Sequence, residues 1–264
     1  RGESSRRSII VDMNAEKADD SRTGGMNKLA SVYSIPLSNP TKISPVPRYS
    51  NGNRTAWLKQ WFKPLPSIAH LPSCYPTEIQ LLRSSGRWSN GRDESSIQAA
   101  YCHLIKHAER YIYIENQFFI SGGKAGGKNR ILDALVMRII RAFKARRPFK
   151  VYIFLPLFPG MEGPVDSDDA KPIRIIMYLQ YSTIVRGKKS LYSRLHAAGV
   201  DCPESYLRFY SLRTWEMRAD GLPVTEMVYI HSKCIIVADQ AAVIGSANIN
   251  DRSMVGNHDS EVAY

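Results

Sequence analysis

Four polar side chains near the end of the sequence are spaced so that they could act together on one substrate. His231 and Lys233 lie two residues apart in an apolar segment, and Ser246 and Asn248 lie two residues apart in or just past the next one. Side chains two apart on a strand share a face. If the two segments are neighbouring strands joined by a short turn at Asp239, the four groups converge.

The cleavage of a phosphodiester is the chemistry that suits such a group. The negative charge of a phosphodiester repels nucleophiles and must be neutralised as the phosphorus is attacked. Lys233 supplies positive charge, and Ser246 and Asn248 can donate hydrogen bonds to the phosphoryl oxygens. His231 can act as a nucleophile or as an acid and base, because imidazole ordinarily titrates near neutral pH. This chemistry requires neither a metal ion nor a cofactor.

Composition restricts the partners and the compartment. Lys and Arg number 36 against 24 for Asp and Glu, which gives a formal net charge of +12. Nucleic acid and acidic membrane lipid both suit that charge. The four cysteines are scattered singly, which argues against a zinc site and favours a reducing, cytoplasmic environment. No apolar run reaches the roughly 18 residues of a membrane span, so any membrane contact is expected to be peripheral.

From residue 77 onward the sequence alternates between strand and helix patterns. This order is typical of a mixed α/β domain whose central sheet is sandwiched by helices. Helices are predicted after an N-cap at Asp93, over residues 131–143, and from Pro172 to Ile184. Strands are predicted at residues 79–82, 111–115, 150–155, 207–210, 228–237 and 242–247.

Residues 1–76 show little periodicity and are rich in Ser, Asn and Pro, so we interpret them as a linker or surface insertion. Their cluster of Trp57, Trp61 and Phe62 is expected to dock on the main domain or to touch a membrane or partner. The sequence begins without Met and stops at Tyr264 within a predicted strand. We therefore expect a piece of a longer protein, with a lobe at residues 77–264 that is truncated at its C-terminal end.

The pattern HxK followed by GSxN resembles the HKD motif of the phospholipase D superfamily. It stands in YIHSKCIIVADQAAVIGSANIN at residues 229–250. IYIENQFFI at residues 112–120 and GSANINDRSMVGNHDSEVA at residues 245–263 are also similar to eukaryotic phospholipase D. The resemblance covers roughly residues 78–264 and is strongest to the second, C-terminal copy of the motif.

The resemblance implies half of an active site. In that family two HKD lobes meet, one histidine forms a covalent phosphohistidine, and the other acts as acid and then base. It implies the acid and base role for His231 and places the nucleophile on an N-terminal HKD lobe, since no second HxK occurs in this chain. The implied reaction converts phosphatidylcholine to phosphatidic acid and choline, or transfers the phosphatidyl group to an alcohol.

The resemblance also implies partners and further site residues. Phosphoinositide activators could meet the basic stretches at residues 144–150 and 186–189, and small GTPases are regulators in the family. Glu261 matches a carboxylate expected to orient the His231 ring by a hydrogen bond. Glu115, Asn116 and Gln117 are candidates to line the cleft and bind substrate.

One position departs from the family pattern. The family's Asp stands five residues after the Lys, and this sequence has Ala238 there, with Asp239 one residue later. A shift of one residue reverses the face of a strand. Asp239 is therefore a catalytic candidate whose alternative role is to cap the turn.

Three other interpretations of the sequence stay open. A phosphodiesterase or nuclease of the same superfamily could complete its site as a homodimer of single-motif chains. An inactive half could bind anionic lipid or a partner, which the Ala238 departure favours. The plainest alternative is a strand that carries His231 and Lys233 on a solvated face, although the flanking apolar residues argue against it. Nucleic acid is the less favoured partner, because the quoted motifs resemble the lipid enzymes.

Overall fold

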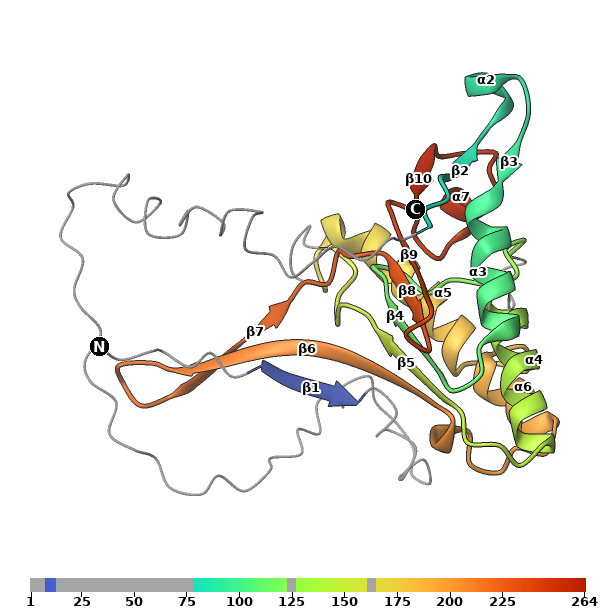
Figure 1. Ribbon diagram of the computed structural model, residues 1–264. Helices are drawn as coiled ribbons and strands as arrows, with labels where there is room; N and C mark the ends of the chain where they lie inside the picture. The colour runs from blue at the N-terminus through green and yellow to red at the C-terminus, as the bar shows by residue number, and fades with distance from the viewer. Residues whose placement is uncertain (1–7, 13–77, 123–126, 161–164) are drawn as a thin grey trace, which may run out of the picture. The chain divides into compact units, whose positions relative to one another are not determined.

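The computed structural model describes residues 8–12, 78–122, 127–160 and 165–264. In this part of the chain, a mixed sheet carries strands in the order β1-β6-β5-β4-β8-β9, with β7 paired to the far part of β6 (Figure 1). β4, β5 and β6 run parallel, and the other pairings are antiparallel. The strands are β1 (Ser8–Asp12), β4 (Tyr111–Glu115), β5 (Lys150–Phe154), β6 (Leu207–Met217), β7 (Pro223–Val228), β8 (Cys234–Val237) and β9 (Ala241–Ile244).

Helices bury one face of this sheet. α3 (Ser96–His107), α4 (Ile131–Lys144) and α6 (Leu191–Ala197) lie to the same side of the strands in Figure 1. α5 (Lys171–Ile184) joins the same core through Ile184. Alternate strand residues such as Ile114, Ile153 and Phe209 are fully buried in the common core. This alternation follows from the two-residue period of a strand. The predicted mixed α/β class is confirmed.

The opposite face of the sheet is lined by aromatic rings. Phe154 lies between Tyr113 and Tyr210, with ring centroids 5.3 and 5.2 Å away. Tyr152 continues this row beside Tyr210. These side chains are half-buried, so the two faces of the sheet differ in both composition and burial.

One prediction fails where the candidate motif begins. Residues 228–237 were predicted as a single strand, whereas β7 ends at Val228 and β8 begins at Cys234. The reason is the strand order: β7 pairs with β6 and β8 pairs with β4, while β5 lies between β6 and β4. Residues 229–233 must therefore cross the end of β5, and a segment that crosses strands cannot join the ladder of either neighbour.

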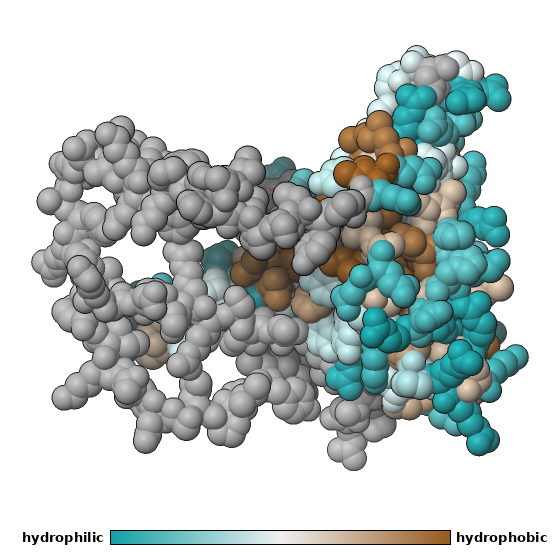
Figure 2. All heavy atoms as spheres, viewed as in Figure 1, coloured by the Kyte–Doolittle hydropathy of each residue, from teal (hydrophilic) through white to brown (hydrophobic). Residues whose placement is uncertain are grey.

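A second, three-stranded sheet adjoins the end of β9, where Gly245 forms a bridge to Ala263. It has the order β10-β2-β3, from β10 (Glu261–Ala263), β2 (Leu82–Ser85) and β3 (Glu94–Ser95). α2 (Arg87–Asn90) and α7 (Asp251–Met254) precede β3 and β10. Figure 2 shows apolar side chains gathered over this small sheet, where Leu81 and Val262 are exposed.

Two boundaries near the small sheet differ from the prediction. The strand expected at residues 79–82 is instead β2, which starts at Leu82. Asp93 was expected to cap the next helix, but its carboxylate accepts from the Arg87 backbone N–H. Glu94 and Ser95 then pair with β2, so the helix begins only at Ser96. The helix therefore starts two residues later in the sequence than predicted, because Glu94 and Ser95 pair with β2.

Part of the predicted linker is a strand. Within residues 1–76, the backbone of Ser8–Asp12 pairs with β6 as β1. Residues 13–77, with the cluster at Trp57, Trp61 and Phe62, lie outside the described residues, so the prediction for them stays a prediction. Among the described helices, none combines the length and apolar character of a membrane span.

Gly256 provides a test of how α7 packs against the small sheet. Its φ is +87°, and a Cβ there would lie 2.2 Å from the Glu94 backbone oxygen. Gly187 has nearly the same φ, +89°, but open space around it. An alanine pays the same cost for a left-handed backbone at both positions, because the two φ values are nearly equal. We therefore expect Gly256→Ala to lower the free energy of unfolding by roughly 1–3 kcal/mol more than Gly187→Ala, because of the steric clash. Chemical denaturation measures both variants, and equal losses would contradict this packing.

Candidate active site

Lys233 is a buried cation with neutral partners. Its side chain is 8% exposed. Nζ donates to the His231 backbone oxygen at 2.6 Å and lies 3.5 Å from Gln117 Oε1. Burial lowers the pKa of Lys233, and the charge of the nearby Glu261 partly opposes this effect. A cation in this setting has lost hydration without gaining an ion pair, so an anion that reaches it is bound favourably.

His231 lies in the crossing segment and is exposed. Its ring stacks on the ring of Tyr229, with centroids 6.0 Å apart and planes 22° from parallel. The predicted alternation of His231 and Lys233 along a paired strand is wrong, because neither residue belongs to a strand. The two residues are instead linked through the backbone, by the bond from the Lys233 ammonium to the His231 oxygen.

Gln117 connects this segment to two loops. It follows β4, and its Nε2 donates to Tyr229 Oη at 2.8 Å and to the Pro159 oxygen at 3.4 Å. Tyr229 Oη also donates to the Pro159 oxygen at 2.8 Å. Pro159 follows β5, so the ends of two parallel strands and the crossing segment meet at one place, as is common for sites in α/β sheets.

Ser246 is brought beside Lys233 by the β8–β9 hairpin. Cys234 pairs with Ile244, and the Gly245 N–H donates to the Lys233 oxygen at 3.1 Å. A Cβ on Gly245 would lie 2.3 Å from the Val262 oxygen, so the close approach of β9 to β10 requires glycine at this position. Ser246 is exposed directly beyond this contact.

Glu261 takes a different place from the one predicted. It was expected to accept a hydrogen bond from the His231 ring, but its carboxylate accepts from the hydroxyls of Ser246 and Ser253, the latter at 2.7 Å. The reason is its position on β10, which runs alongside Ser246. Glu261 therefore orients the Ser246 hydroxyl and contributes negative charge near Lys233.

Asn248 is held at the site by Asn116. The Asn116 side chain is fully buried, and its Oδ1 accepts from the Ile249 N–H at 3.0 Å and the Phe118 N–H at 3.2 Å. Its Nδ2 donates to the Ala247 oxygen at 3.4 Å. These bonds clamp the backbone on both sides of Asn248. Asn116 thus lies behind the site, although it was predicted to bind substrate.

The side chain of Asn248 is half-buried, and its Oδ1 has no hydrogen-bond partner among the described residues. Buried polar atoms are nearly always paired, so an unpaired acceptor at a candidate site suits a ligand that donates a hydrogen bond. The predicted donation from Asn248 to a phosphoryl oxygen would come from Nδ2 instead, and it stays a prediction.

Asp239 does not join these groups. It lies in the turn between β8 and β9, where its carboxylate accepts from the Tyr111 hydroxyl. β8 rises about 3.3 Å per residue, which puts this turn on the order of 13 Å beyond Lys233. The prediction that Asp239 is catalytic is therefore corrected to its alternative role in the turn. Ala238 and Asp239 both have left-handed backbones, with φ of 49° and 59°, which costs about 1–2 kcal/mol at the alanine.

Glu115 lies at the edge of the site. Its carboxylate accepts from the hydroxyls of Ser232 and Tyr113, so it holds the residue between His231 and Lys233. Its role as a substrate ligand stays a prediction.

Two supporting residues were missed in the sequence. No role was predicted for Tyr229, which lies in the motif segment, although it contacts His231, Gln117 and Pro159. Asp251, which begins α7, accepts from the N–H groups of Lys128 and Asn129 at 2.7 and 2.9 Å. The contacts of Tyr229 with Gln117 and Pro159, and that of Asp251 with Lys128, leave no local signal, since these partners are 70 or more residues apart in sequence.

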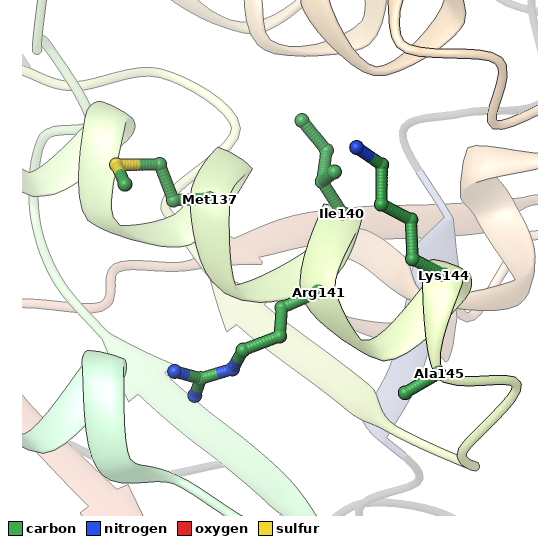
Figure 3. A pocket seen from close by; sticks show the side chains of 5 residues that line it. All are labelled: Met137, Ile140, Arg141, Lys144 and Ala145. Carbon is green, nitrogen blue, oxygen red and sulfur yellow. The ribbon is translucent and has the colours of Figure 1, made fainter.

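A hollow on the outer face of α4 lies elsewhere. Figure 3 shows that Met137, Ile140, Arg141, Lys144 and Ala145, all on or just after this helix, line it. Arg141 extends away from Lys144, and its guanidinium donates to the Lys106 backbone oxygen. None of the predicted site residues takes part.

Together the fold and the site define an α/β lobe suited to bind a phosphodiester at one edge of its sheet. The family model for phospholipase D matches residues 22–264. The chain belongs to the phospholipase D family, and the predicted resemblance is confirmed.

Two curated relatives, of yeast and of a plant, agree with this assignment. Phospholipase D1 of Saccharomyces cerevisiae is 46% identical over 237 residues, which is 88% of this chain and 14% of that protein. Phospholipase D zeta 1 of Arabidopsis thaliana is 48% identical over 189 residues, 69% of this chain and 17% of that protein. A solved phosphatidylserine synthase of Haemophilus influenzae is 15% identical with a TM-score of 0.41, covering 69% of this chain and 33% of that one. The chain thus spans only a small part of these curated relatives.

The Asn116 clamp predicts a loss of stability. Asn116→Leu removes the side-chain partners of the buried Ile249 N–H and Ala247 carbonyl and of the part-buried Phe118 N–H, and an unpaired buried group costs about 1–3 kcal/mol. We expect the free energy of unfolding to fall by at least about 2 kcal/mol in chemical denaturation. Asn257→Leu, on an exposed loop, should change it by less than about 0.5 kcal/mol. Similar values for the two variants would refute the clamp.

The buried ammonium predicts a gain of stability when it is removed. Because the folded pKa of Lys233 is lowered, the folded chain binds its proton less tightly than the unfolded chain. The cost is fully present below the folded pKa and disappears as pH rises toward the ordinary value for lysine. Lys233→Met should therefore raise the free energy of unfolding at pH 7, with a smaller gain near pH 10. The exposed Lys189→Met is the control, and a Lys233→Met chain less stable than wild type at pH 7 would contradict the argument.

Proposed function

We propose that this chain supplies one of the two HKD half-sites of a phospholipase D. The proposed reaction hydrolyses phosphatidylcholine to phosphatidic acid and choline, or transfers the phosphatidyl group to an alcohol. The observation that carries the proposal is the buried ammonium of Lys233, whose hydrogen-bond partners among the described residues are neutral. Such a group lacks an anion, and the phosphodiester of a phospholipid supplies one.

The neighbouring groups suit the other parts of that reaction. Asn248 can donate from Nδ2 to a phosphoryl oxygen as negative charge develops on it. Ser246 donates its one hydroxyl proton to Glu261 in this structure, so in the proposed reaction that hydroxyl turns from Glu261 to a phosphoryl oxygen. The exposed ring of His231 is accessible to a substrate and to a second lobe. The proposed site uses no metal ion or other cofactor.

The proposed chemistry has two steps. In the first, the histidine of an N-terminal HKD lobe attacks phosphorus and forms an N–P bond as the P–O bond to choline breaks, and His231 gives its proton to the leaving oxygen. In the second, His231 takes a proton from water as the water oxygen attacks phosphorus. The N–P bond then breaks and phosphatidic acid is released. An alcohol in place of water gives the transfer product.

We further propose that the protein acts in the cytoplasm as a peripheral membrane protein. The net charge of +12 attracts anionic lipid surfaces. Exposed basic residues follow α4 and α5, including Arg147 and Lys188, and these could meet phosphoinositides. Arg141 and Lys144 point apart, which favours diffuse electrostatic attraction over a built phosphate pocket (Figure 3). Small GTPases are proposed as regulators on family grounds alone.

A chimera tests the role of His231. The matched segment of the Saccharomyces cerevisiae relative is replaced by this chain, and phosphatidylcholine hydrolysis is measured in vesicles. We expect turnover in the chimera and a loss of about 10²–10⁴-fold on His231→Ala, the usual contribution of an acid and base. His258→Ala, another exposed histidine, is the matched control and should keep normal turnover. Full activity of the His231→Ala chimera would overturn the mechanism.

The isolated chain distinguishes the alternatives. No turnover alone, with turnover in the chimera, agrees with a half-site. Phosphodiester cleavage by the isolated chain as a dimer would instead identify a homodimeric phosphodiesterase or nuclease. Vesicle binding without turnover in any form would identify an inactive lipid-binding half.

A further inference from the structure

Two partners fix the direction of the Gln117 amide. The Pro159 carbonyl oxygen can only accept a hydrogen bond, so the Gln117 NH₂ group must face it. The Lys233 ammonium can only donate, so the Gln117 oxygen must face Lys233. A glutamine in this orientation is the side chain that satisfies both neighbours without adding charge.

Tyr229 completes the connection. Its hydroxyl accepts from Gln117 Nε2 and donates to the Pro159 oxygen, each at 2.8 Å. Its ring lies nearly parallel to that of His231. Tyr229 therefore contacts His231 through the face of its ring and Gln117, the partner of Lys233, through its hydroxyl.

We propose that Gln117 and Tyr229 are positioning residues that hold the Lys233 ammonium and the His231 ring relative to each other and anchor both to the loop after β5. This inference deepens the proposed function and rests on it for the catalytic consequence. It assigns Gln117 a supporting role in place of direct substrate binding, and it gives Tyr229 a role that the motif alone does not indicate.

Positioning is needed here because the crossing segment has no strand ladder to hold it. Lysine is a flexible side chain, and holding it in one conformation costs side-chain entropy. The Gln117 amide is held by two partners of its own, so it provides a fixed acceptor for the ammonium. Because glutamine is neutral, it leaves the charge of Lys233 available to a phosphate, which a carboxylate at this position would not.

Gln117 carries no charge, so its replacement removes none of the charged groups around Lys233. Glu261 on β10 raises the pKa of Lys233 through its charge. Glu115, at the end of β4, is bound to Ser232 and Tyr113. His231 offers Lys233 its backbone oxygen. A change in Lys233 titration in a Gln117 variant therefore reports on the Gln117 contact.

The first test requires no turnover. The chain is labelled with ¹³C at the lysine ε-carbon, and Lys233 is assigned by its absence in Lys233→Arg and titrated by NMR. Gln117→Leu removes an acceptor from the charged form, so the Lys233 midpoint should move to lower pH. Gln240→Leu, on the distant β8–β9 turn, should leave it unchanged. An unchanged midpoint in Gln117→Leu would overturn the proposed hold on Lys233, whether or not the protein is a phospholipase.

The second test uses the chimera. Tyr229→Phe keeps the ring on His231 but removes the hydroxyl, and we expect kcat to fall about 10- to 100-fold with KM within about twofold of wild type. Tyr229→Leu also removes the ring contact and should lower kcat further. Tyr178→Phe, on the exposed face of α5, is the control and should leave kcat unchanged. Wild-type kcat in Tyr229→Phe, or a loss confined to KM, would overturn the positioning role.

Discussion

The site depends on the passage of residues 229–233 from β7 to β8. β7 is paired with β6 and β8 with β4, and β5 separates those neighbours. The connecting segment therefore crosses the end of β5, where the loops after β4 and β5 also lie. Released from strand pairing, its side chains bond to those loops, as Tyr229 does to Pro159. The topology thereby gathers Lys233, His231 and Gln117 at a single edge of the sheet.

The same arrangement makes the site unfavourable for folding. Lys233 is desolvated, and its hydrogen-bond partners among the described residues are neutral oxygens. Its charge therefore lowers the free energy of unfolding as long as no anion is bound to it. Hydrogen-bonded clamps elsewhere offset part of this cost. Asn116 closes the backbone around Asn248, and Asp251 ties α7 to the segment at Lys128. The chain thus surrounds an electrostatically unfavourable group with a hydrogen-bonded framework.

The departure from the family motif acts at a distance from this site. Ala238 and Asp239 form the far turn of the β8–β9 hairpin, and Asp239 binds the Tyr111 hydroxyl. The missing acid therefore bears on the geometry of the turn, where a left-handed alanine is strained, and not on the groups around Lys233. This placement weakens the argument that Ala238 marks an inactive half.

The sequence by itself determined the class of fold, the α4 and α5 helices and the β4 strand, because their periodic burial and the proline near the start of α5 are local properties. It also determined the motif residues, whose types and spacing identify the family. It did not determine the break after Val228 or the partners of Glu261. Those depend on which strand lies between which neighbours and on β10 running beside Ser246. Only the tertiary structure decided them, because such contacts join residues that no local pattern relates.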